Sequence, residues 1–187
     1  MIDQNSTLVD VAFAICTKLT ECGFEVVLVG GSAATYYAPD AYQSADVDFV
    51  AFFSATEENT ARLVAAMHAL GYDLEANMFR NRNGNPFTVE FPKGPLGIGG
   101  EYVTKYEKVK RDLQTLNVVS ATDCIRDRLC AYYFWNDRSS LLVAVDIALA
   151  AADKVDMQAI RDWSSREQES RKFDDFVRLL ESKRGSR

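Results

Sequence analysis

Histidine is almost absent from this sequence: His68 is the only one among 187 residues. It falls beside the apolar positions of a predicted amphipathic helix, where a half-exposed side chain with no chemical role is expected. Nucleophilic triads and most zinc sites depend on histidine as a base or as a ligand. Histidine-based catalysis and a histidine-rich metal site are therefore excluded as the main chemistry.

Positive charge is also in short supply. The chain has 21 Lys and Arg against 27 Asp and Glu, a net charge of −6. A general nucleic-acid binder would show a basic excess, so that class is disfavoured. One basic cluster is expected on a solvated face, with docking of an acidic or RNA acceptor as the alternative. It consists of Lys105, Lys108, Lys110 and Arg111.

Long apolar runs and paired cysteine motifs are missing too. No run approaches the roughly 20 apolar residues that cross a membrane. The four cysteines form no C-x-x-C pair, and we see no signal peptide. We therefore expect free thiols and a cytoplasmic protein without membrane contact. The cysteines are Cys16, Cys22, Cys124 and Cys130.

Local patterns predict a mixed first part and a helical second part. The expected strands are 24–29, 46–53, 72–75 and 87–91. Helices are expected after Thr7, after the glycines at 30–31 and over 57–70, and then over 121–135, 139–152, 157–163 and 166–182. Trp135 is expected in the core. The prediction is an α+β fold, with a short mixed sheet and flanking helices over 1–119 and a helical region over 120–187 packing on it.

Two glycines and a serine follow the strand expected at 24–29: Gly30, Gly31 and Ser32. A turn without side chains lets backbone N–H groups approach a phosphate, and the helix that follows adds a favourable dipole. Ser32 adds a hydroxyl donor. Such a turn is common without any ligand, so its meaning depends on what lies nearby.

Two aspartates open the next apolar strand. Asp46 and Asp48 are two residues apart, so both side chains leave the same face. Two like charges on one face are unfavourable unless a cation neutralises them. Carboxylates beside a phosphate cradle suit Mg²⁺, which serves phosphoryl and nucleotidyl transfer.

A third carboxylate is expected from a neighbouring strand, and Glu90 is the candidate. Val89 and Phe91 would share one face of the strand at 87–91, and Glu90 would point to the other. The alternative is an ordinary charge on an edge strand.

These residues resemble the motif of the DNA polymerase beta-like nucleotidyltransferase superfamily: an apolar residue, Gly-Gly or Gly-Ser, a gap, and an apolar-flanked Asp-x-Asp. The resemblance implies a minimal nucleotidyltransferase fold. It also implies that Asp46 and Asp48 bind Mg²⁺ or Mn²⁺, that Glu90 is the third acid, and that Gly30, Gly31 and Ser32 hold the triphosphate of an NTP.

The stretch from Ser120 to Arg138 is similar to the helical segment of small prokaryotic nucleotidyltransferase-like proteins, some related to toxin–antitoxin and abortive-infection systems. Within it, Asp127 and Arg128 are candidate substrate contacts, and an intrahelical charge network is the equal alternative. The corner from Trp135 to Arg138 is expected as a capped turn between helices, with contact to a base or an acceptor as the alternative.

Three hypotheses follow. The first is a metal-dependent enzyme that moves an NMP from NTP to an acceptor (tRNA, protein or a small molecule) and releases pyrophosphate. The second is a nucleotide-binding regulatory protein of the same fold without turnover. The third is an interaction protein with an antitoxin-like partner, for which the sequence pattern shows no dedicated hydrophobic surface.

Overall fold

The structure is a computed structural model, and it describes residues 2–54, 56–92 and 94–185. Its helices are α1 (Leu8–Glu21), α2 (Gly30–Tyr37), α3 (Glu57–Ala69), α4 (Ala121–Trp135), α5 (Arg138–Ala150), α6 (Met157–Arg166) and α7 (Ser170–Gly185). Its strands are β1 (Val26–Leu28), β2 (Asp46–Ala51), β3 (Tyr72–Glu75), β4 (Met78–Asn81), β5 (Thr88–Glu90), β6 (Gly97–Ile98), β7 (Glu101–Tyr102), β8 (Glu107–Arg111) and β9 (Gln114–Val118).

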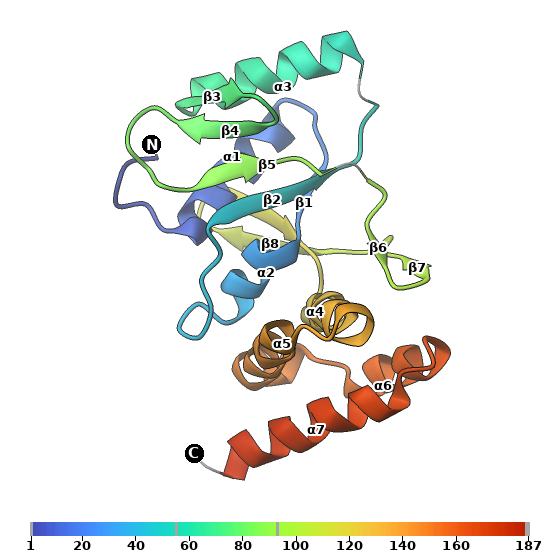
Figure 1. Ribbon diagram of the computed structural model, residues 1–187. Helices are drawn as coiled ribbons and strands as arrows, with labels where there is room; N and C mark the ends of the chain where they lie inside the picture. The colour runs from blue at the N-terminus through green and yellow to red at the C-terminus, as the bar shows by residue number, and fades with distance from the viewer. Residues whose placement is uncertain (1, 55, 93, 186–187) are drawn as a thin grey trace.

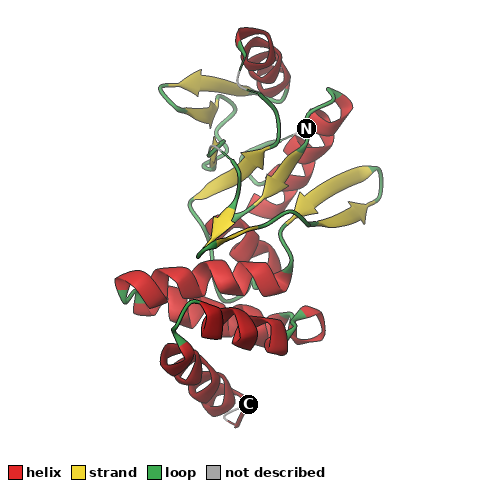
Figure 2. Cartoon of the chain, turned by 90° about the vertical axis from the view of Figure 1, so that its right-hand side faces the viewer, coloured by secondary structure: helices red, strands yellow, loops and turns green. Residues whose placement is uncertain are grey.

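The large sheet is mixed and seven-stranded, in the order β3-β4-β5-β2-β1-β9-β8. The β2–β5 and β1–β9 pairs are parallel, and the other pairs are antiparallel. Helices α4 to α7 stack below this sheet, with α7 farthest from it, and α3 lies above it (Figure 1). The view at 90° shows the same layering (Figure 2). The predicted α+β fold, a mixed sheet with flanking helices and a helical C-terminal region, is confirmed.

The strands at the centre of the sheet follow the expected burial. All of β1 is buried, and Val47 and Phe49 of β2 are buried on the face opposite to Asp46 and Asp48. Phe49 stacks on Phe91 with their ring centroids 6.1 Å apart. One face of β2 and β5 is therefore committed to the hydrophobic core, which leaves the other for polar chemistry.

The first helix begins as predicted. The Thr7 hydroxyl accepts from the Asp10 N–H at the start of α1, and the Asp10 carboxylate accepts from the Thr7 N–H. The two hydrogen bonds form a capping box. In contrast, α2 begins at Gly30, whereas the helix was expected to begin after the glycines. Gly30, Gly31 and Ser32 form its first turn, with Val29 as the N-cap, and no separate turn precedes it.

Strands β4 and β6 to β9 were not predicted, and β4 forms a hairpin with the expected strand β3. Strand β6 pairs with β7 to form a two-stranded sheet. Strands β8 and β9 add to the edge of the large sheet, and the basic cluster lies on β8 and, at Lys105, just before it. Lys105, Lys108 and Lys110 are exposed there, as expected of a solvated face, while Arg111 binds Asp10 at 2.8 Å.

Two expectations about the helical region are wrong. Helix α6 continues through Trp163 to Arg166, because Trp163 is fully buried and stacks on Tyr133 with centroids 5.5 Å apart. Trp135 is not in the core: it lies at the end of α4 with 75 % of its surface exposed. The place that Trp135 was expected to fill beneath α4 is taken by Trp163.

In the described part of the chain, no helix combines the length and the apolar character needed to cross a bilayer.

Candidate active site

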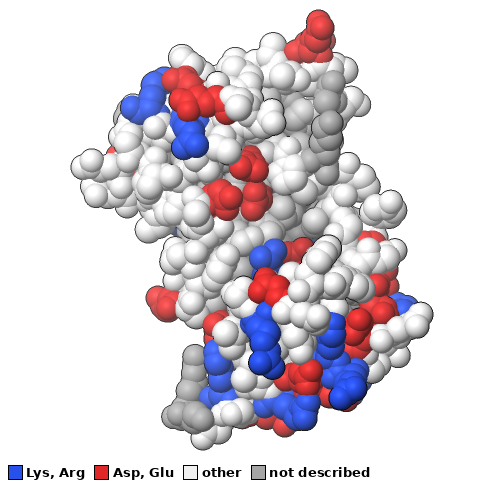
Figure 3. All heavy atoms as spheres, in the orientation of Figure 1, with Lys and Arg blue, Asp and Glu red and all other residues white. Residues whose placement is uncertain are grey.

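Three acidic residues occupy neighbouring positions where β2 and β5 lie side by side. In the parallel register, Asp48 is directly opposite Glu90, and Asp46 is opposite Thr88. Asp46 and Asp48 share a face of β2, so Glu90 joins them on that face. Figure 3 shows acidic side chains gathered near the middle of the molecule, at the level of β2 and β5 in Figure 1.

The surroundings of Asp48 disfavour the ionised form of its carboxyl. Burial, followed by the charges of Asp46 and Glu90, raises the pKa of Asp48 from its ordinary 3.8 to about 6. Arg128 opposes this rise, and Asp127 adds to it. The cluster thus crowds negative charge at Asp48, and Arg128 is one cation that partly compensates for it.

Asp46 is held in place by the loop that precedes its strand. The Ser44 hydroxyl donates to Asp46 Oδ1 at 2.9 Å, and the Ser44 backbone N–H donates to the Thr35 hydroxyl of α2 at 2.8 Å. The carboxylate is therefore linked to α2 through Ser44. Sequence reasoning did not single out Ser44, although a hydroxyl two residues before a candidate ligand is a signal that could have been used.

Gly30 leaves space for the Asp48 carboxylate, and Gly31 leaves space for the hydroxyls of Ser44 and Tyr42. Gly30 has φ of +61°, and a Cβ there would lie 3.0 Å from Asp48 Oδ2. At Gly31 a Cβ would lie 2.8 Å from the Ser44 hydroxyl and 3.1 Å from the Tyr42 hydroxyl. Gly30 is needed for its backbone conformation and Gly31 for the close approach, so each glycine has a separate physical reason.

Ser32, predicted to help hold the triphosphate, makes two hydrogen bonds within the protein. Its side chain is buried, its hydroxyl donates to the Val29 carbonyl at 2.7 Å, and it accepts from the Asp48 N–H at 3.1 Å. The hydroxyl thus joins the first turn of α2 to β2. A contact with phosphate would require it to give up the bond to Val29.

A cleft of about 360 Å³ opens beside Gly30 and Asp48, and its described lining includes neither Asp46 nor Glu90. Its walls include Gly30, Asp48 and Val50 from the sheet side, Leu96 from the segment before β6, and Asp127 from α4. Asp127 accepts from Nε and Nη2 of Arg128, at 3.1 and 2.5 Å. The structure therefore brings Asp127 to the cleft, with Arg128 bound to it.

The hairpin β6–β7 forms one wall of the cleft, and an ion-pair clamp holds it. Glu101 of β7 binds Arg126 of α4 at 2.5 Å and Arg166 of α6 at 2.7 Å. The Gly100 N–H donates to Glu167 at 2.8 Å. We call Glu101, Arg126 and Arg166 the hairpin clamp; sequence reasoning missed it because its members are far apart along the chain.

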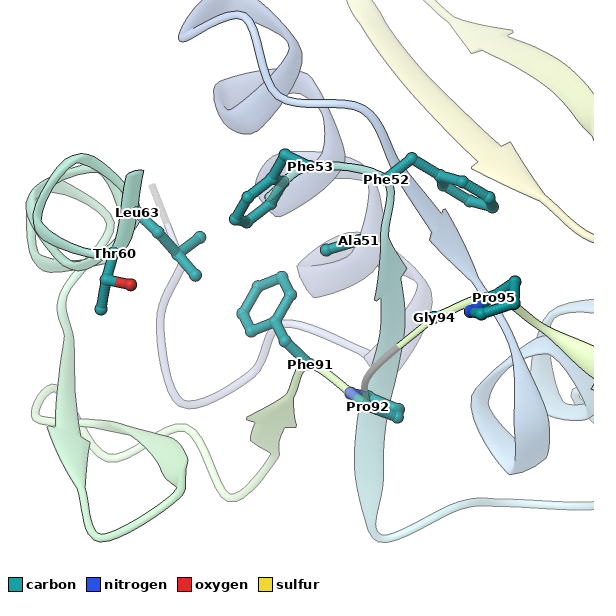
Figure 4. A pocket seen from close by; sticks show the side chains of 9 residues that line it. All are labelled: Ala51, Phe52, Phe53, Thr60, Leu63, Phe91, Pro92, Gly94 and Pro95. Atoms are coloured by element: carbon teal, nitrogen blue, oxygen red, sulfur yellow. The ribbon is translucent and has the colours of Figure 1, made fainter. Parts of the chain in front are cut away.

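A separate apolar cavity of about 550 Å³ lies beyond the end of β2. Phe52, Phe53 and Phe91 surround it, and Thr60 is the polar side chain in its described lining (Figure 4). It shares Pro92 and Pro95 with the wall of the cleft. Its described lining offers no acid or base, so it can accept only an apolar group.

The donor set can be tested against the metal that the motif implies. Carboxylate oxygens alone suit Mg²⁺ or Mn²⁺ rather than zinc or copper. Over residues 2–54, 56–92 and 94–185, however, no three acidic, histidine or cysteine side chains stand in an arrangement that could hold an ion. Asp46, Asp48 and Glu90 therefore fit the ion by chemistry and strand register, and the side chains would have to converge to bind it.

Neither a protein-family model nor a curated protein matches the amino-acid sequence. Solved structures do match. An antigenic nucleotidyltransferase-like protein from Paracoccidioides brasiliensis superposes with a TM-score of 0.55 at 14 % identity, over 89 % of this chain and 94 % of that one.

Two further matches have lower scores. A crystal structure of ANT(2")-Ia in complex with adenylyl-2"-tobramycin gives a TM-score of 0.49 at 10 % identity, over 86 % of this chain and 96 % of that one. A solution structure of ANT(2'')-Ia gives 0.45 at 13 % identity, over 96 % of both chains. The match above 0.5 establishes the fold: this chain is built like a nucleotidyltransferase-like protein.

Proposed function

We propose that this protein is a nucleotidyltransferase that moves a nucleoside monophosphate from an NTP to an acceptor and releases pyrophosphate. The observation that carries the proposal is the direct pairing of Asp48 with Glu90 across parallel strands, with Asp46 on the same face and the first turn of α2 beside them. The likeness in fold supports it.

In this proposal the three carboxylates hold Mg²⁺ or Mn²⁺. When bound, the metal neutralises negative charge on the reacting phosphates. Asp46 and Asp48 would hold the cation, whose charge would offset the burial and the neighbouring charges that raise the pKa of Asp48. The Glu90 carboxylate completes the set from β5.

The first turn of α2 binds the triphosphate. The backbone N–H groups of Gly30 and Gly31 are orphan donors at a helix start, where anions are favoured. The acceptor's oxygen attacks the α-phosphorus, the bond to the β-phosphate oxygen breaks, and pyrophosphate leaves. The acceptor's proton passes to the Glu90 carboxylate.

Label transfer tests the proposal. The purified protein is incubated with Mg²⁺ and each common α-³²P-labelled NTP, with and without a cell extract, and the labelled fraction is identified. We expect transfer from at least one NTP, lost in Asp48→Asn and kept in Asp174→Asn, which changes an exposed aspartate of α7. Nucleotide binding without any labelled product would favour the regulatory alternative.

Three finer expectations from the sequence belong to this proposal without support from the comparisons. They are the acceptor class (tRNA, protein or a small molecule), a cytoplasmic location, and the relation to toxin–antitoxin or abortive-infection proteins with an antitoxin-like partner. The identity of the labelled fraction would decide the first.

A further inference from the structure

Two neighbouring aromatic side chains at the end of α4 are unusually open to solvent. Trp135 is 75 % exposed and Phe134 is 47 % exposed. Tryptophan is normally well buried, and exposed large aromatics beside a pocket are typical of binding sites. The chain's other tryptophan, Trp163, is fully buried, so the exposure of Trp135 is not a general property of the helical region.

These aromatics line a pocket of about 550 Å³, which we call the Trp135 pocket. Its other walls include Gly97 and Gly99 of the β6–β7 hairpin and Asp127 and Arg128 of α4. Phe134 and Trp135 follow Asp127 by seven and eight residues. They therefore lie about two turns further along α4, on the same side as Asp127.

The Trp135 pocket continues from the catalytic cleft. Gly97 and Asp127 belong to the walls of both. At about 1.5 Å per residue, the pocket extends about 12 Å along α4 from Asp127 to Trp135. A single molecule can therefore begin at Gly30 and Asp48 and enter the pocket past Asp127.

We propose that the Trp135 pocket binds the nucleobase of the donor NTP by stacking it on Trp135. This inference rests on the proposed function. A base has a flat apolar face and polar edges, and aromatic side chains stack on any base. Asp127 accepts and Arg128 donates at the same wall, which suits the edges of the ring.

The apolar cavity beyond β2 is the competing place for the ring, and it fits poorly. Thr60 is the polar side chain in its described lining, so the edges of a base would lose water without gaining partners. The Trp135 pocket offers both a stacking surface and charged donors and acceptors, so it is the better match.

The two tryptophans make the test direct. Trp135 is exposed and Trp163 is buried, so a nucleotide in the pocket quenches one of the two fluorescence signals. The full chain is titrated with each common NTP, with free nucleosides, and with inorganic tripolyphosphate, which has no ring, in Mg²⁺. The variants are Trp135→Ala, Trp135→Phe and, as control, Leu113→Ala at a 97 % exposed site between β8 and β9.

We expect NTPs, and not tripolyphosphate, to quench the wild-type signal. Trp135→Ala should weaken NTP binding about tenfold or more, measured by calorimetry, because stacking on the ring is lost. Trp135→Phe should restore most of that affinity, and tripolyphosphate should bind all variants equally. Because Trp135 is largely exposed, its replacement leaves the fold intact, which circular dichroism and a thermal melt verify.

If each NTP binds Trp135→Ala as tightly as it binds wild type, the inference is overturned and the proposed function still stands. An equal loss for NTP and tripolyphosphate would overturn it as well, since the ring would then play no part. If tripolyphosphate and NTP fail to bind while free nucleosides still quench Trp135, the proposed function fails and a ring-binding pocket stands by itself.

Discussion

Replacing Asp48 with asparagine should stabilise the metal-free protein while abolishing its function. Asp48 is partly buried, opposite Glu90 and on the same face as Asp46, and burial followed by these two charges raises its pKa to about 6. The folded protein therefore disfavours the charged form of this carboxyl. Asparagine keeps the shape of the side chain and removes the charge, so the repulsion disappears.

The magnitude follows from the pKa of Asp48 in the folded and unfolded chains. Each pKa unit is worth about 1.4 kcal/mol, so the rise from 3.8 to about 6 corresponds to at most about 3 kcal/mol of destabilisation. Asp48 is only partly buried, and solvent screening reduces this value. We expect Asp48→Asn to raise the free energy of unfolding by about 1 to 2 kcal/mol at pH 7.5.

The pH dependence gives the sign a second test. Well below pH 3.8 the carboxyl is protonated in both states, so it carries no penalty. Between pH 4 and pH 6 the unfolded chain ionises Asp48 while the folded chain holds the proton, and wild-type stability falls through this window as pH rises. The advantage of Asp48→Asn should therefore be small near pH 4 and complete above pH 7.

Urea unfolding in EDTA at pH 4.0 and pH 7.5 measures both effects, with Asp174→Asn on the exposed surface of α7 as the matched control. If Asp48→Asn is no more stable than wild type at pH 7.5, or if its advantage is the same at both pH values, the carboxylates do not repel as argued. The metal site would then lose its electrostatic basis.

Three further predictions concern the same cleft. Mg²⁺ with NTP should raise the melting temperature of wild type and leave an Asp46→Asn/Asp48→Asn variant unchanged; equal shifts in a thermal-shift assay would count against the site. Gly31→Val should abolish nucleotide binding because its side chain enters occupied space, and normal binding of nucleotide in calorimetry would contradict that role of Gly31. Ser32→Ala should lower the free energy of unfolding by about 1 to 3 kcal/mol, because the Asp48 N–H loses its hydrogen-bond partner. Glu90→Gln should reduce label transfer by about two to four orders of magnitude with nucleotide affinity unchanged, and unchanged transfer would remove Glu90 from the chemistry.

The centre of the fold was predictable because its signals are local. The buried run before Gly30, the capping of α1 by Thr7 and the two-residue spacing of Asp46 and Asp48 each lie within one short window of sequence. The position of Glu90 next to Asp48 needed one long-range step, the parallel pairing of β2 with β5.

The features that sequence reasoning missed depend on distant partners. Strands β6 and β7 have two residues each, too few for any periodic pattern, and Glu101 is held by arginines 25 and 65 residues away. Trp135 is apolar enough to suggest burial, yet Trp163 already packs against Tyr133 under α4. The sequence identifies Ser32 as a possible hydrogen-bond donor, but only the fold shows that its hydroxyl donates to the Val29 carbonyl.

The hairpin clamp makes the cleft a product of both halves of the chain. A fragment ending at residue 119 would keep every strand of the large sheet and all three carboxylates. It would lack Arg126 and Arg166, so Glu101 would lose both of its cationic partners and the wall at Gly97 would lose its anchor. A protein shortened to its strand-rich part should therefore lack the α4 wall of the cleft and expose Asp48 to solvent. A substitution of Arg166 in α6 should also disturb the cleft, although Arg166 does not line it.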